Sequence, residues 1–170
     1  MRRIVVMGPP GSGKSTLARR LGARYGLPVF HLDQAYWQPG WIETPPEAFR
    51  AEVERIAALP AWVIDGNYTT ATIEPRLRAA DTLIYLDVPA WLSMLRIVWR
   101  TLTRYGQVRA DSAPGCVERL DPGFVRFVWT WNRIRRTRNL ALVEGFRGRR
   151  IVLRPGSAAW RRFWKNGVST

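Results

Sequence analysis

An eight-residue stretch near the N-terminus, GPPGSGKS at residues 8–15, most constrains what this chain can fold into. It fits the Walker A pattern G-x-x-x-x-G-K-[ST], whose last three positions fall on Gly13, Lys14 and Ser15. Glycines at positions 8, 11 and 13 allow the backbone to curl, so that successive N–H groups point into one hollow. The stretch therefore predicts a loop that wraps around a chain of phosphate groups.

The sequence on either side of this loop supports the same interpretation. Residues 3–7 have the pattern of a short buried strand, and residues 15–25 have the apolar spacing of a helix. The loop then lies at a helix N-terminus, where the helix dipole favours phosphate. Lys14 supplies a mobile charge for the β and γ oxygens, and the Ser15 hydroxyl suits Mg²⁺. The residues expected to contact ATP here are Gly8, Gly11, Ser12, Gly13, Lys14, Ser15 and Thr16.

Length and composition predict one globular domain over residues 1–170. Hydrophobic residues make up 46% of the chain and nine are Trp, which excludes a disordered polypeptide. The single cysteine, Cys116, allows no internal disulfide and no multi-cysteine zinc site, so we expect a cytoplasmic protein. The apolar run before Gly8 is too short for a secretion signal. Asp87 and Pro89 interrupt the apolar stretch 82–103, so no membrane span is expected.

The net charge of +14 comes from 27 Lys and Arg against 13 Asp and Glu, and only Lys14 and Lys165 are lysines. Arginine in such excess suits bidentate contact with phosphate, although genomic base composition could produce the same excess. A positive field favours anionic partners. Both nucleotides and nucleic acid remain open as partners.

Two carboxylates follow predicted strands. Residues 27–33 read as a second strand that ends in Asp33, and residues 61–68 read as a third strand with Asp65 at its tip. In an open parallel sheet both lie on the same rim as the phosphate-binding loop. Asp65 has the position of a Walker B carboxylate that reaches Mg²⁺ or its water. Asp33 either acts on an acceptor hydroxyl, or holds Mg²⁺ through water, or belongs to a helix cap or turn. His31 is expected to be structural.

Two further features follow Asp33. Trp37 and Trp41 flank a Pro-Gly turn, and their rings either stack on a base or cover the core. A helix is predicted over about residues 45–59. Thr44 would cap it and Glu47 would complete a capping box.

A fourth strand over residues 81–87 leads into a helix with two distinct faces. Arg96, Arg100 and Arg104 recur every four residues and are either solvated or directed at phosphates. The long irregular segment 105–123 is typical of a lid. The other face is apolar at helical spacing, through Trp91, Leu92, Leu95, Val98, Trp99 and Leu102.

In the last third of the chain, the apolar spacing predicts an amphipathic helix from residue 124. This helix is expected to continue into an arginine cluster at residues 133–138. Four arginines in six residues form either a phosphate clamp or a nucleic-acid patch. Residues 149–153 read as a fifth strand. A short helix with Trp160, Phe163 and Trp164 turned inward closes the chain.

These motifs together resemble the small P-loop kinases of the nucleoside-monophosphate kinase superfamily. Within it, the chain looks most like the adenylate-kinase-related proteins often labelled DNA topology modulation proteins. The resemblance rests on residues 8–15, on HLD at residues 31–33 with WQPGW at 37–41, on VIDGNY at 63–68, and on LDVP at 86–89.

The resemblance implies an α/β fold with a five-stranded parallel sheet in the order 2-3-1-4-5, helices on both faces and a lid. It implies ATP and Mg²⁺ as donor, an acceptor-binding helix near residues 45–59 and a lid near 105–123. Adenylate kinases carry an acceptor-site arginine where this chain has Asn67 and Tyr68, so AMP is not implied as acceptor. Arginines implied to neutralise the transferred group are Arg100, Arg104, Arg109, Arg133 and Arg136. Residues implied to touch adenine are Arg154, Pro155 and Gly156.

Three functions are compatible with these features. The first is a kinase that moves the γ-phosphoryl group of ATP to a nucleotide-like or other small acceptor, with Lys14, Asp33 and Asp65 as central residues. The second is a nucleic-acid-binding protein with a regulatory nucleotide pocket, motivated by the charge and by residues 133–138. The third is a nucleotide-dependent switch without transfer. The Walker A motif favours the kinase, because the net charge indicates only that the protein has anionic binding partners.

Overall fold

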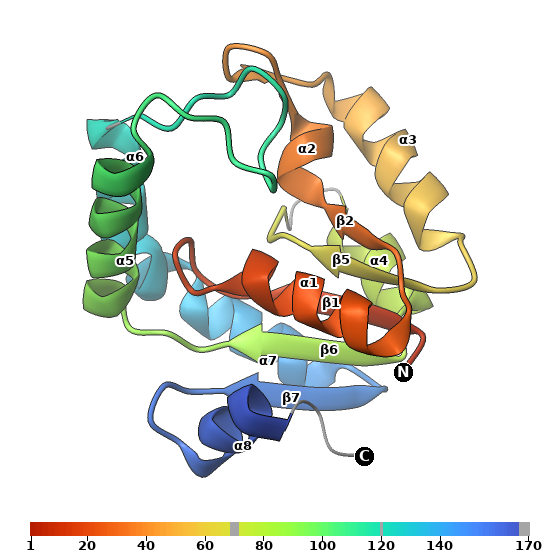
Figure 1. The fold of residues 1–170 in the computed structure, drawn as a ribbon. Coiled ribbons are helices and arrows are strands. Elements are labelled where there is room, and N and C mark those ends of the chain that lie inside the picture. The colour runs from red at the N-terminus through yellow and green to blue at the C-terminus, as the bar shows by residue number, and fades with distance from the viewer. Residues whose placement is uncertain (69–71, 120, 167–170) are drawn as a thin grey trace.

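The computed structural model describes residues 1–68, 72–119 and 121–166 as an α/β fold with three layers (Figure 1). A five-stranded parallel sheet has the order β2-β5-β1-β6-β7. Its strands are β1 (Arg3–Met7), β2 (Val29–His31), β5 (Trp62–Asp65), β6 (Thr82–Leu86) and β7 (Arg149–Leu153). The helices are α1 (Lys14–Tyr25), α2 (Leu32–Tyr36), α3 (Pro46–Ala57), α4 (Ile73–Ala79), α5 (Ala90–Arg104), α6 (Pro122–Ile134), α7 (Arg136–Gly145) and α8 (Ala158–Asn166).

The predicted sheet is confirmed. Counted in chain order among the sheet's own five strands, the order is 2-3-1-4-5. The labels are higher because β3 (Trp37–Gln38) and β4 (Ile42–Glu43) form a separate two-stranded hairpin between the second and third strands. Val6 of β1 pairs with Asp65 of β5, and Asp65 pairs with His31 of β2. The carboxyl ends of three strands therefore meet beside the phosphate-binding loop.

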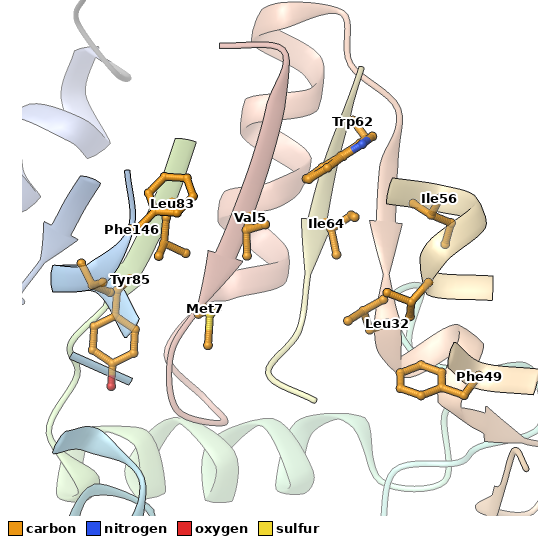
Figure 2. Close-up of a cluster of buried hydrophobic side chains, with 12 residues drawn as sticks. Val5, Met7, Leu32, Phe49, Ile56, Trp62, Ile64, Leu83, Tyr85 and Phe146 are labelled. Atoms are coloured by element: carbon orange, nitrogen blue, oxygen red, sulfur yellow. The ribbon is translucent and has the colours of Figure 1, made fainter. Parts of the chain in front are cut away.

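Each face of the sheet has its own apolar core, because successive side chains of a strand point to opposite faces. Ile4 and Val6 of β1 pack beneath α1 and Phe163 of α8. Val5 and Met7 belong to the other cluster, with Phe49 and Ile56 of α3 among its members. Figure 2 shows this second cluster, with the α3 side chains directed toward Ile64 and Leu32. Burial on both faces explains why the strands read as continuous apolar runs.

Three predicted boundaries are wrong. The second strand ends at His31, and the chain turns at once into α2, so Asp33 lies in a helical first turn. Helix α3 has Pro45 at its N-cap without a side-chain cap bond. Thr44 instead donates its backbone N–H to the carbonyl of Tyr36, at 2.8 Å, as part of the hairpin. The predicted long helix into the arginine cluster is interrupted at Arg135, where α6 ends and α7 begins.

The apolar face predicted on α5 is real, but apart from Leu92, which packs against the core, its residues are exposed. Ser93, Ile97 and Thr101 are the buried residues of this helix, whereas Trp99 is 69% exposed. The reason is the close approach of the phosphate-binding loop. A Cβ added to Gly11 would lie 2.6 Å from the carbonyl oxygen of Ser93, so only the small inner face of α5 fits there. Within the described ranges, no helix is long and apolar enough to cross a membrane.

Candidate active site

The predicted phosphate-binding loop turns directly into the N-terminus of α1. Gly11 has φ of 73° and is pressed against α5, as noted above. Gly13 has φ of 95°, and a Cβ added there would meet nothing within 4 Å. Ser12 is fully buried, and its hydroxyl lacks a hydrogen-bond partner among the described atoms. The loop therefore presents both free space and an unsatisfied polar group, whereas Thr16 is exposed on the next turn.

Lys14 lies where two carboxylates and two arginines converge. Its ammonium donates to the carbonyl of Pro9 at 3.1 Å. Burial lowers the pKa of Lys14. The carboxylates of Asp65 and Asp33 partly offset this effect, whereas two arginines lower the pKa of Lys14 further. These arginines are Arg100 and Arg109. Four of the residues singled out from the sequence thus lie within electrostatic reach of Lys14.

Asp65 is buried at the tip of β5 and contacts His31. The Nδ1 atom of His31 is 2.9 Å from Oδ2 of Asp65. The other oxygen, Oδ1, has no hydrogen-bond partner in the described structure. A buried carboxylate oxygen without a partner is costly, which makes it a fitting contact for a cation or its water. His31 was expected to be structural only, because the cross-strand register that brings it to Asp65 is invisible in a single strand.

Asp33 is held by Tyr68. The Tyr68 hydroxyl donates to Oδ1 of Asp33 at 2.8 Å. Burial raises the pKa of Asp33, and the nearby Asp65 carboxylate raises it further, while Tyr68, Lys14 and Arg109 act in the opposite direction. Burial also raises the pKa of the Tyr68 hydroxyl. Asp33 is therefore a carboxylate that takes up a proton more readily than usual, close to Lys14.

Asn67 joins the third strand region to the phosphate-binding loop. Its side-chain oxygen accepts from the N–H of Gly8 at 3.2 Å, and its side-chain nitrogen donates to the carbonyl of Gly8 at 2.8 Å. This two-way contact fixes the first residue of the loop against the segment that follows β5. In the sequence, Asn67 stood out only because an arginine would have suited an adenylate kinase.

Arg76 of α4 binds the backbone of the segment that follows β5. It is completely buried, and its guanidinium donates to the carbonyls of Gly66, Asn67, Tyr68 and Thr72 at 2.9 to 3.0 Å. Burial lowers the pKa of Arg76 to about 9, and the Asp65 charge opposes this. Nothing in the local sequence distinguishes this arginine from the exposed Arg78, because its partners are backbone carbonyls of another segment.

The predicted lid runs from Tyr105 to Asp121, two residues short of the expected end, because α6 begins at Pro122. Leu120 lies outside the described residues. Its centre is an ion-pair cluster around the buried Glu118. The Glu118 carboxylate contacts Arg100 at 2.9 Å and Arg109 at 3.2 Å. It also accepts from the Thr101 hydroxyl at 3.1 Å.

A second lid carboxylate, Asp111, reaches the phosphate-binding loop itself. Burial alone would raise the pKa of Asp111, but Arg109 and a hydrogen bond with the Ser15 side chain hold it below its ordinary value. Arg109 and Asp111 are 3.7 Å apart. In this arrangement a lid residue contacts the hydroxyl predicted to bind magnesium.

The lid also contacts the opposite side of the site, where it meets α2 and the hairpin (Figure 1). Gln34 donates to the carbonyl of Ala110 at 2.9 Å, and the indole N–H of Trp41 donates to Val117 at 3.1 Å. The Cys116 thiol is 3.2 Å from the carbonyl of Gln38. These contacts join residues 110–117 to α2 and to the hairpin, and Trp41 is part of that contact surface.

The remaining predicted arginines divide into three groups. Arg96 contacts the carbonyl of Ser12 at 3.2 Å, whereas Arg104 and Arg133 are exposed and make no ion pair within the described chain. Arg135 stacks over the rings of Phe127 and Trp131. The arginine cluster is therefore not one continuous patch.

Arg136 and Arg154 both bind Asp87 at the end of β6, at 2.7 and 2.9 Å. They thereby join α7 to the turn after β7, where the adenine contacts were expected. Pro155 and Gly156 form that turn, and Gly156 has φ of 81°.

Comparisons with known proteins give relatives by sequence and solved structures with the same fold. No protein-family profile matches the chain. It is 29% identical over 128 residues to a cytidylate kinase of Desulfurococcus amylolyticus, which covers 66% of this chain and 68% of that protein. It is 30% identical over 99 residues to a shikimate kinase of Rhodococcus jostii, which covers 51% of this chain and 59% of that protein. The second match thus spans little more than half of the relative's length.

Solved kinase structures share the fold. A gluconokinase from Sinorhizobium meliloti 1021 superposes with a TM-score of 0.54 at 17% identity, over 94% of this chain and 86% of that chain. A shikimate kinase from Bacteroides thetaiotaomicron gives 0.52 at 14% identity, over 96% and 97%. At such identities the likeness shows the P-loop kinase fold alone. The relatives and the structural neighbours are kinases named for different substrates, and none of these four is a DNA topology modulation protein.

Proposed function

We propose that the protein is a P-loop phosphotransferase that moves the γ-phosphoryl group of ATP to a small acceptor, in the manner of nucleoside-monophosphate kinases. The observation that carries the proposal is the convergence of Lys14, Asp33 and Asp65 beside an open phosphate-binding loop and beneath a lid. Phosphoryl transfer needs chiefly positioning and charge stabilisation, which this set of residues can supply.

The residues present fit ATP and Mg²⁺. Gly13 faces open space, the Ser12 hydroxyl is unsatisfied, and Oδ1 of Asp65 is a buried acceptor without a partner. When bound, the magnesium nucleotide supplies the transferable phosphoryl group and a divalent positive charge. Ser15 and Asp65 would hold the metal, and Lys14 would contact the phosphates. Other residues proposed to bind the nucleotide are Gly8, Gly11, Ser12, Gly13, Thr16, Arg154, Pro155 and Gly156.

Asp33 would orient the acceptor hydroxyl and take its proton. Its raised pKa brings it nearer to the acidity that a general base needs, and Tyr68 keeps its carboxylate in one orientation. A wall of rings extends from Tyr68, because Tyr36 lies 4.5 Å and Phe49 lies 5.1 Å from it between ring centroids. A nucleoside monophosphate, a nucleoside or another small hydroxyl compound remains open as acceptor.

The lid arginines would neutralise the transferred group once their present partners release them. Arg100 and Arg109 are now paired with Glu118, and Asp111 is bonded to Ser15. Rearrangement of the lid around substrate would exchange these protein carboxylates for phosphate oxygens, which also accept bidentate hydrogen bonds from arginine. Arg104 and Arg133 are exposed, and a catalytic role for them requires the same rearrangement.

The test is ADP release from ATP and Mg²⁺ with a panel of candidate acceptors. Lys14→Ala is expected to lower the acceptor-dependent rate by about 100-fold or more, as removal of one preorganised donor typically does. Arg19→Ala, on the exposed side of the same helix, is the matched control and is expected to keep the rate. Wild-type turnover in folded Lys14→Ala would refute the assignment.

Nucleic-acid binding remains the alternative function, on the observation that Arg133 and Arg138 are exposed in a chain of net charge +14. Such binding must weaken steeply with salt, because phosphate contacts release counterions. A titration against duplex DNA at low ionic strength distinguishes the two proposals. Absence of binding there would eliminate the alternative, and it would leave the kinase proposal untouched. A cytoplasmic location also stays a prediction.

A further inference from the structure

Helix α5 carries an apolar stripe with the spacing of a helix-pairing seam. Trp91, Leu95, Val98 and Leu102 follow one another at intervals of four, three and four residues, and Tyr105 at the C-cap of the helix comes three residues later. This is the a/d repeat by which two helices pack along their length. The exposed fractions of these five residues range from 39% to 74%, and Trp99 beside them is 69% exposed. In the part of the chain that the structure describes, the seam has no partner.

The charges of α5 lie away from this seam. Arg96 and Arg100 are directed toward the site, where they contact Ser12 and Glu118. Residues 91, 94, 95, 98, 99, 102 and 105, which make up the outer side, include no charged residue. A phosphate backbone or an anionic lipid surface needs cationic side chains at the contact itself. The seam is therefore suited to an apolar protein surface.

The size of the seam also fits a protein partner. Taking about 200 Å² for a whole aromatic side chain, the exposed parts of Trp91, Trp99 and Tyr105 alone amount to about 400 Å². The largest apolar patch of an ordinary monomer is about 300–600 Å², and Leu95, Val98 and Leu102 add to this value. A specific interface buries about 800 Å² per partner. One helix thus contributes a large part of the area that a stable dimer needs.

We propose that α5 pairs antiparallel with α5 of a second copy, around a two-fold axis near Val98. Val98 is the middle residue of the seam, so a two-fold axis there places each half of the stripe against the other half of the second copy. The antiparallel arrangement aligns the helix dipoles favourably and keeps the two Arg104 side chains apart. Because the inner face of α5 contacts the phosphate-binding loop, the dimer contact would also support the site from outside.

Sedimentation velocity across a dilution series tests the proposal. The wild-type chain is expected to dimerise, and Leu95→Glu with Leu102→Glu is expected to weaken association by about 100-fold or more, as loss of two central contacts does. Both leucines are exposed, so the thermal midpoint of the diluted monomer should change little. The control is Trp129→Ser, an equally exposed apolar residue on α6 that lies outside the seam and should leave association intact.

Disulfide trapping tests the geometry. Under oxidation, Val98→Cys is expected to form a covalent dimer, because the axis brings this position close to its own copy. Trp129→Cys is the matched control and should stay a monomer, and native Cys116 is buried in both variants. Efficient trapping of Trp91→Cys would indicate parallel helices and overturn the antiparallel arrangement.

Three outcomes contradict the dimer. One is a wild-type chain that sediments at its monomer mass of 19.5 kDa at every concentration. Another is a double glutamate variant that still dimerises. The third is a wild-type monomer that floats with phosphatidylserine vesicles and loses this binding in the double variant, which would assign the seam to a lipid surface.

Discussion

The segment after β5 and the lid both contact the phosphate-binding loop, but different interactions hold them in place. The segment from Gly66 to Thr72 is tied to Arg76 through buried bonds to backbone carbonyls, and Asn67 extends that attachment to Gly8. Residues 69–71 of it lie outside the described ranges. The lid is held by ion pairs around Glu118 and by a few bonds to the hairpin.

This difference separates a fixed part of the site from an exchangeable one. The bonds from Arg76 to the carbonyls of Gly66 and Thr72 are buried, so breaking them leaves polar groups unsatisfied in the interior. The arginines bound to Glu118 have an alternative, because the phosphates of a nucleotide can also accept bidentate hydrogen bonds from a guanidinium. The segment after β5 therefore sets the geometry of the site, while the lid is able to respond to substrate.

The largest effect is expected from Arg76→Met, which removes the guanidinium that binds four backbone carbonyls of the segment. The free energy of unfolding should fall by about 3 kcal/mol or more, since several buried carbonyls lose their partners. Urea unfolding measures this. Arg78→Met, two residues along α4 in an exposed pair with Glu74, is the control and should cost less than about 1 kcal/mol. Equal losses in the two variants would contradict the proposed anchoring.

The next effect is expected from Asn67→Ala, which frees Gly8 from its neighbour. Stability should fall by about 1–2 kcal/mol, and ATP affinity should fall by about tenfold because the loop is no longer preorganised. Calorimetric titration with ATP provides the measurement. Asn67→Asp keeps an acceptor for the Gly8 N–H but loses the donor, so an intermediate affinity is expected. An unchanged affinity in Asn67→Ala would show that the loop needs no such support.

A smaller effect is expected from Glu118→Gln. Loss of its charge weakens the attachment of Arg100 and Arg109, so amide exchange in residues 105–119 should accelerate by about tenfold while exchange in the sheet stays constant. Glu74→Gln, in the exposed ion pair of α4, should leave the lid unchanged. If the lid of Glu118→Gln exchanges as slowly as the wild type, the ion pairs do not hold it.

The smallest effect concerns the pH dependence of Asp33. Its pKa is raised in the folded state, so ionised Asp33 destabilises the fold at pH values above that pKa. Asp33→Asn should stabilise the protein by about 1 kcal/mol at pH 7, and the gain should shrink as pH falls through the raised pKa toward the ordinary value. Urea unfolding at several pH values measures this.

Asp81 is expected to have the opposite effect on stability, because its pKa is lowered in the folded state. Thr82 and the N–H groups of Arg2 and Arg3 lower the pKa of Asp81 although burial opposes them. Asp81→Asn should therefore destabilise the protein at neutral pH, and this loss should disappear in acid. A loss of stability in Asp33→Asn at pH 7 would contradict the sign assigned to Asp33.

The sequence predicted well those parts of the molecule that depend on patterns of neighbouring residues. The phosphate-binding loop, the five strands and their order follow from glycine spacing, from apolar runs and from the family resemblance. The segment 27–33 was predicted less well, because the residues of α2 continue the apolar pattern of β2. Leu32 itself packs closely against Gly66, where a Cβ would lie 2.8 Å from the Leu32 side chain, a contact between distant parts of the sequence.

The unpredicted site residues share a cause. His31 meets Asp65 through cross-strand register, Asn67 meets Gly8 across 59 residues of chain, and Arg76 binds carbonyls that have no sequence signature. The outward face of α5 was also unpredicted, because periodicity shows that a helix has an apolar side and says nothing about what lies against that side.

Cys116 makes the closing of the lid directly observable. It is the one cysteine of the chain, it is 1% exposed, and its thiol is directed at the carbonyl of Gln38 on the hairpin. A thiol-modifying reagent can reach it only while the lid is away from the hairpin, so the labelling rate in unmodified protein reports how often that separation occurs. Cys116 is therefore a built-in reporter of lid opening, and any compound that holds the lid against the hairpin will slow its labelling.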